Sequence, residues 1–67
     1  MILQDALRLF SRLGVDVPQL TQKQFAAAYI VLAKRYHPNG GFLVDEELMK
    51  NINAARTTVL QSFRREE

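Results

Sequence analysis

Apolar residues recur at intervals of three and four in three stretches of this chain, and this spacing constrains the fold more than any other feature. Such a period places apolar side chains along one face of an α-helix. The stretches cover about 3–13, 22–36 and 46–63. In the third stretch the predicted core stripe has Met49 and Leu60 on its margin and consists of Leu48, Ile52, Ala55, Val59 and Phe63. Because neither a strand pattern nor an internal repeat accompanies them, the sequence predicts an all-α fold of three helices.

The ends of the predicted helices coincide with residues that suit helix termini. Gly14 follows the last apolar position of the first stretch, where a left-handed C-terminal cap favours glycine. Thr21 and Gln24 form a Thr-x-x-Gln capping box, and Asp45 is the expected N-cap of the third helix. Pro38 ends the second helix, because proline lacks an amide hydrogen and disfavours helical angles in the residue before it.

A loop over 37–44 joins the second and third helices, which should run antiparallel and bury facing apolar stripes. We expect the short first helix to pack across this hairpin. With 67 residues the chain should form one domain over 1–67, close to the lower limit for a fold held by an apolar core alone.

The composition argues against metal, cofactor and enzyme chemistry. There is no cysteine, which excludes disulfides and thiolate ligands and favours a reducing intracellular compartment such as the cytoplasm or an organelle matrix. His37 is the only histidine, so it cannot build a zinc site by itself. Acid-base catalysis would have to centre on His37 without an obvious helper, so we expect no enzyme.

Nucleic-acid binding and membrane insertion are also not expected. The net charge is only +2, and the third helix starts with Asp45, Glu46 and Glu47, which repel phosphates. No apolar run approaches the roughly 20 residues that span a bilayer. Residues 1–14 have some features of a mitochondrial presequence, but Asp5 and the scarcity of serine argue against that interpretation.

Three short motifs occur in order along the chain. Leu13-Gly14-Val15 comes first; Tyr36-His37-Pro38-Asn39 follows Ala28-Tyr29 and Leu32-Ala33-Lys34-Arg35; Ile52-Asn53-Ala54-Ala55 comes last. Together they resemble the J-domain, the module of DnaJ-type co-chaperones, whose second helix leads into a His-Pro-Asp loop. The resemblance covers roughly residues 5–60 and implies the three-helix fold of that family.

In that family the second helix and the loop bind an ATPase chaperone of the DnaK class and stimulate ATP hydrolysis. The resemblance therefore implies that His37 and Pro38, with Lys34 and Arg35, bind a partner. Asn39 departs from the family aspartate, which can accept two charge-assisted hydrogen bonds from an arginine. Because losing such a bond costs about 1.5–3 kcal/mol, we expect stimulation to be weak or absent.

The outward face of the second helix departs from the family in the same direction. It carries Lys23, Ala27, Ile30 and Val31 before Lys34, so apolar residues replace much of the expected basic charge. Ile30 and Val31 lie off the core stripe and should stay exposed unless a loop or tail covers them. They form a candidate contact patch for a protein partner, either a second copy or another J-domain, as in the paired J-domains of mitochondrial import motors.

Three functions remain open from the sequence. The first is a degenerate J-domain-like module that binds or regulates a DnaK-class chaperone system with weak or no ATPase stimulation. The second is a functional variant co-chaperone in which Asn39 still serves. The third is a small structural or protein-interaction domain that keeps the fold without chaperone function.

Overall fold

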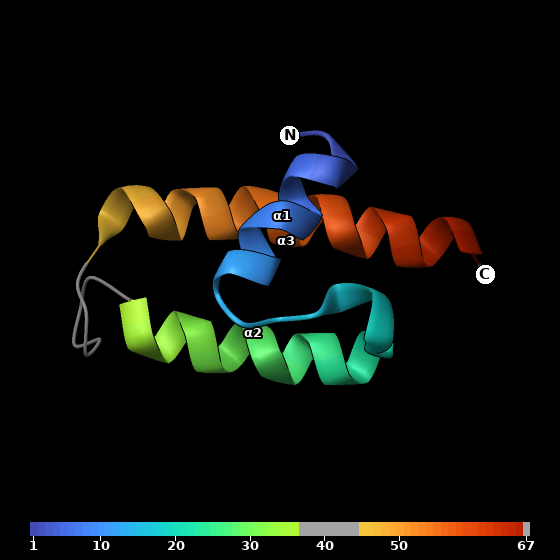
Figure 1. Cartoon of the computed structure of the whole chain (residues 1–67), viewed down its shortest axis with the longest axis horizontal. Helices are drawn as coiled ribbons and strands as arrows, with labels where there is room; N and C mark the ends of the chain where they lie inside the picture. Colours follow the sequence, from blue (N-terminus) through green and yellow to red (C-terminus); the bar gives the residue numbers. More distant parts are fainter. Residues whose placement is uncertain (37–44, 67) are drawn as a thin grey trace.

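The computed structural model describes residues 1–36 and 45–66, which form three α-helices and one short 3-10 helix (Figure 1). Their bounds are α1 Leu3–Arg12, η1 Val17–Gln19, α2 Gln22–Tyr36 and α3 Glu46–Glu66. The described ranges contain no strand, so the all-α fold of three helices is confirmed. Two details differ from the sequence prediction: α3 continues to Glu66, and η1 forms where only a connection was expected.

Gly14 follows the C-cap Leu13 and terminates the first helix, as its sequence position predicts. The φ angle of Gly14 is +85°, in the left-handed region. Its amide donates to the carbonyl of Ser11 at 3.1 Å, and the amide of Val15 donates to the carbonyl of Phe10 at 2.8 Å. These two bonds make a Schellman motif, which satisfies carbonyls at the end of α1 and turns the chain towards η1.

Side chains cap the starts of α2 and α3. The amide of Thr21 donates to Oε1 of Gln24 at 2.9 Å, and the amide of Gln24 donates to Oγ1 of Thr21 at 3.2 Å. At α3 the amide of Leu48 donates to a carboxylate oxygen of Asp45 at 3.0 Å. The predicted capping box and N-cap are therefore both confirmed, and each satisfies backbone donors that a helix start leaves free.

The long helices α2 and α3 lie side by side and run in opposite directions, and α1 crosses α3 (Figure 1). Both α1 and α2 contact α3, which makes α3 the shared support of the fold. The buried core draws on all three helices and on the connection between α1 and α2: Ala6, Phe10, Val15, Val17, Phe25, Leu32, Met49, Ile52, Ala55 and Val59.

Phe25 of α2 lies at the point where the three helices meet. Its ring stands edge-on to that of Phe10 in α1, with centroids 5.0 Å apart and planes at 87°, and its centroid lies 6.0 Å from that of Phe63 in α3. Phe10 and Phe25 are fully buried. Edge-to-face packing adds to the apolar burial, so this cluster fixes the three helices relative to one another.

One part of the core differs from the predicted stripe of α3. The sequence interpretation placed Leu48 on the stripe and Met49 on its margin, whereas Met49 is buried and Leu48 is half-buried. Counting back from Ile52, the helical period allows the next core residue to lie either three positions earlier, at Met49, or four positions earlier, at Leu48. Packing against the neighbouring helices buries Met49, and the period alone does not determine this choice.

Candidate functional site

The outward face of α2 is the surface that the sequence singled out, and it is exposed. Ile30 is 52% exposed to solvent and Val31 is 55% exposed. Ala27 is exposed beside them. Within residues 1–36 and 45–66, no loop or tail covers Ile30 and Val31. The alternative that another part of the described chain buries them is therefore wrong.

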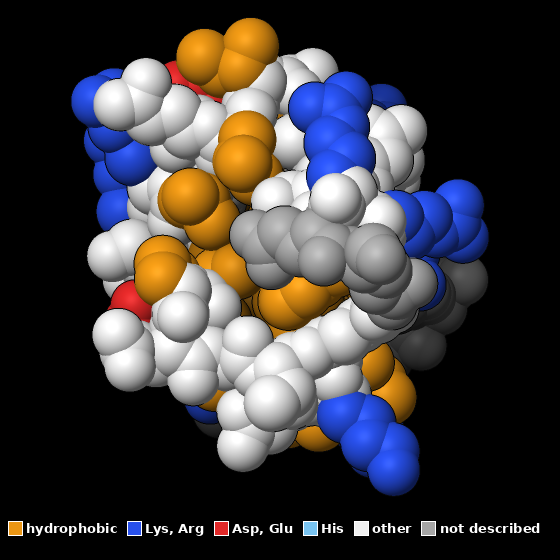
Figure 2. Space-filling view, turned by 90° about the vertical axis from the view of Figure 1, so that its right-hand side faces the viewer, with side chains coloured by type: hydrophobic (Ala, Val, Ile, Leu, Met, Phe, Trp, Pro, Cys, Tyr) orange, Lys and Arg blue, Asp and Glu red, His pale blue; other side chains and the backbone are white. Residues whose placement is uncertain are grey.

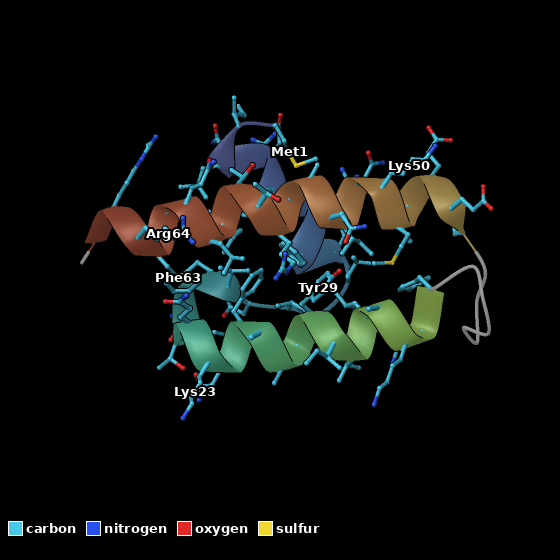
Figure 3. The ribbon with its side chains drawn as sticks, turned by 180° about the vertical axis from the view of Figure 1, so that it is seen from behind. Met1, Lys23, Tyr29, Lys50, Phe63 and Arg64 are labelled. Atoms are coloured by element: carbon cyan, nitrogen blue, oxygen red, sulfur yellow. The ribbon has the colours of Figure 1, made fainter. Side chains whose placement is uncertain are left out.

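Basic residues border this apolar patch at both ends of the helix. Lys23 lies in the first turn of α2, and Lys34 and Arg35 lie in the last turn. All three are exposed. Lys23 lies on the side of α2 that faces away from α3 (Figure 3). We call Lys23, Ala27, Ile30, Val31 and Lys34, with Arg35 at its edge, the outer face of α2.

A structural role accounts for part of this charge. Cations in the last turn of a helix interact favourably with the negative end of its dipole, so Lys34 and Arg35 would stabilise α2 whatever they bind. Lys23 has no such explanation, because it lies at the positive end. The helix dipole alone therefore does not account for the charge pattern of the outer face.

The candidate contact residues His37, Pro38 and Asn39 lie outside the described residues. The structure does place the ends that flank them. Tyr36 ends α2 and Asp45 caps α3, and these two helix ends lie at the same end of the hairpin (Figure 1). The segment 37–44 thus connects adjacent ends of two antiparallel helices.

Polar contacts between α2 and α3 hold the hairpin in register. The hydroxyl of Tyr29 donates to Oδ1 of Asn53 at 2.6 Å, and Tyr29 lies between the two helices (Figure 3). The guanidinium of Arg56 lies 4.8 Å from the centroid of the same ring. The helical period places Tyr29 on the stripe of α2 that faces the third helix, but it names no partner for Tyr29 and no role for Arg56, because nothing local in the sequence indicates which α3 residues lie opposite α2.

A second surface feature, which sequence reasoning missed, lies at the end of the hairpin away from Tyr36 and Asp45. It is a groove of about 230 Å³ between α1, η1 and α3, and most of the residues that line it are apolar. Figure 2 views this end of the molecule and shows hydrophobic side chains gathered on it. Its lining comes from three separate segments of the chain, so no single sequence motif marks it: Leu3, Leu7, Val17, Pro18, Leu20, Val59, Ser62 and Phe63. A second hollow adjoins it, shares Leu3 and Ser62, and is bordered by Arg65.

The described residues offer no arrangement for metal-dependent chemistry. Within 1–36 and 45–66, no group of three or more histidine, cysteine, aspartate or glutamate side chains could hold a metal ion. Over the same ranges, every side-chain nitrogen and oxygen atom that is buried has a hydrogen-bond partner. The outer face of α2 presents exposed apolar and basic side chains.

None of the helices in the described ranges combines the length and the apolar character that crossing a membrane requires.

Comparison with known proteins adds no further identification. The chain matches no family model, no curated protein and no solved structure.

Proposed function

We propose that this chain is a J-domain-like module that binds a DnaK-class ATPase chaperone and stimulates its ATP hydrolysis weakly or not at all. The observation that carries the proposal is the sequence between two antiparallel helices. The connection from α2 to α3 contains His37-Pro38-Asn39, and Lys34 and Arg35 are exposed in the turn of α2 that leads into it.

The helical arrangement supports this proposal through the placement of its motifs. Asn53, in the motif Ile52-Asn53-Ala54-Ala55, accepts the hydrogen bond from Tyr29, in the Ala28-Tyr29 pair that precedes the loop motif. Ile52 and Ala55 are fully buried in the core. Two of the motifs that carry the resemblance are thus in contact across the hairpin.

Asn39 is the reason for proposing weak stimulation. An asparagine offers one acceptor oxygen and one donor group where an aspartate offers two charged acceptor oxygens. An arginine of the chaperone would then lose one charge-assisted bond, worth about 1.5–3 kcal/mol, or roughly ten- to a hundred-fold in an equilibrium constant.

The decisive experiment is a single-turnover ATPase assay with a purified DnaK-class chaperone. The native chain should accelerate hydrolysis little, and Asn39→Asp should raise the acceleration by roughly ten-fold or more. The double variant His37→Gln/Asn39→Asp is the control, and it should lose the gain. If the native chain already accelerates hydrolysis as an intact J-domain does, the functional variant co-chaperone is correct instead.

The exposed patch favours a second candidate function, that of a protein-interaction domain without chaperone activity. Ile30 and Val31 are adjacent, β-branched and exposed, and such patches are typical of contact surfaces. This function predicts that Asn39→Asp changes neither chaperone binding nor ATP turnover. The same assay therefore separates it from the first proposal.

A further inference from the structure

We infer that the outer face of α2 binds a protein surface that is apolar at its centre and acidic at its edges, with Ile30 and Val31 as the apolar anchor. The inference rests on the proposed function and names the chemistry of the partner's side. It differs from a purely basic contact, because here the centre of the face carries no charge.

The apolar centre has the properties of a preformed contact. Ile30 and Val31 are about half exposed in the free chain, so a partner would remove substantial apolar surface from water. Both side chains are β-branched and hold few rotamers in a helix. Little side-chain entropy is therefore lost when they are buried, which favours them as anchors over long flexible side chains.

The charges around this centre have one sign. Within Gln22–Tyr36 there are three basic residues, Lys23, Lys34 and Arg35, and no acidic residue. Lys23 precedes Ile30 by seven residues and Lys34 follows it by four, so a cation lies along the helix on each side of the apolar pair. A complementary surface carries carboxylates on both sides of an apolar centre.

This charge pattern argues against a second copy of the chain as the occupant. If two copies paired through Ile30 and Val31 with their α2 helices antiparallel, Lys23 of one copy would lie within about 6 Å along the axis of Lys34 of the other, given a rise of 1.5 Å per residue. Parallel pairing would place Lys23 against Lys23. Both arrangements bring like charges together inside a Debye length, which disfavours self-association.

A membrane surface fits the face less well than a protein does. An interfacial helix buries a broad apolar face with several large residues. The apolar stripe of α2 that contains Phe25 and Leu32 is already used in the core. The exposed apolar side chains of α2 are Ile30, Val31 and the small Ala26 and Ala27, and such a narrow patch suits a pocket on a protein.

The test measures binding of the intact chain to a purified DnaK-class chaperone by fluorescence anisotropy at low and high salt. The double variant Ile30→Ser/Val31→Ser removes the anchor, and serine matches isoleucine and valine in helix propensity, so α2 should persist. We expect affinity to fall about ten-fold or more at both salt concentrations. Lys34→Gln/Arg35→Gln should weaken binding at low salt and have little effect at high salt.

Ile2→Ser provides the matched control. Ile2 is also an exposed β-branched residue, but it precedes α1 and lies away from the outer face of α2. This substitution should leave affinity unchanged. Circular dichroism of all variants should show the native helix content, which separates loss of contact from loss of fold.

The outcomes distinguish this inference from the proposed function. Binding by the native chain that the double serine variant leaves intact would overturn the apolar anchor alone. Absence of any binding by the native chain would overturn the proposed function and the inference with it. Sedimentation that shows a dimer abolished by Ile30→Ser/Val31→Ser, or flotation with phosphatidylserine vesicles abolished by the same change, would assign the face to another occupant and overturn the inference.

Discussion

The hydroxyl of Tyr29 in α2 and Oδ1 of Asn53 in α3 are joined by a hydrogen bond of 2.6 Å, across a sequence separation of 24 residues. We expect Tyr29→Phe to destabilise the fold by about 1 kcal/mol, the usual net contribution of a single hydrogen bond. Urea unfolding followed by circular dichroism measures this change. The double variant with Asn53→Ala should cost less than the sum of the two single changes.

The matched control for that cycle is Asn51→Ala. Asn51 is exposed on α3 two residues before Asn53, so it points to a different side of the helix. Both alanine substitutions share the same gain in helix propensity. If Tyr29→Phe couples to Asn51→Ala as strongly as to Asn53→Ala, the hydrogen bond is not the source of the coupling.

Phe25 should be the most sensitive aromatic position of the core. Phe25→Leu keeps an apolar side chain but removes the edge-to-face contact with Phe10 and the tilted contact with Phe63. We expect a loss of about 1–2 kcal/mol in the free energy of unfolding. Phe63→Leu should cost less, since Phe63 is only half-buried. An equal or larger cost at Phe63 would contradict the central position assigned to Phe25.

Gly14 offers a test of backbone conformation without a packing effect. A Cβ added at this position would meet no atom within 4 Å, whereas the φ angle of +85° is unfavourable for an L-residue. Gly14→Ala should therefore destabilise the chain by about 1 kcal/mol. In a chemically synthesised chain, Gly14→D-Ala should not destabilise it, because a D-residue favours this φ angle and restricts the unfolded state. Equal losses for both would indicate a steric cause instead.

The capping box at the start of α2 makes a separate prediction. Thr21→Ala removes the hydroxyl that accepts the amide of Gln24 and should cost about 1 kcal/mol. Thr21→Ser keeps a hydroxyl and should leave stability within a few tenths of a kcal/mol of the native value. Thermal unfolding of the three chains measures the difference. A serine variant as unstable as the alanine variant would show that the threonine methyl group is what matters.

Much of the secondary structure was predictable because its determinants are local. The caps at Gly14, Thr21 and Asp45 act through bonds between residues at most five positions apart, so a short stretch of sequence contains both partners of each. The exposure of Ile30 and Val31 was also predictable, since the angle between residues on a helix follows from its geometry. The candidate loop residues His37, Pro38 and Asn39 remain a prediction.

Contacts between distant segments were not predictable in this way. Val15 and Val17 come from the connection after α1, which has no helical period, yet both are buried in the core. The groove near Leu3 and Phe63 forms only because α1, η1 and α3 converge at one end of the hairpin. No single stretch of sequence contains the residues that make these features.

The sequence by itself determined the helix ends that carry caps, at Gly14, Thr21 and Asp45, and which face of α2 stays outside. Only the tertiary structure decided that Met49 is buried more deeply than Leu48, that Phe25 meets Phe10, and that Tyr29 bonds to Asn53. The physical reason is the range of the interactions. Helix caps and periodicity act within one or two turns, whereas core packing depends on how three helices fit together, and a helical period permits more than one such fit.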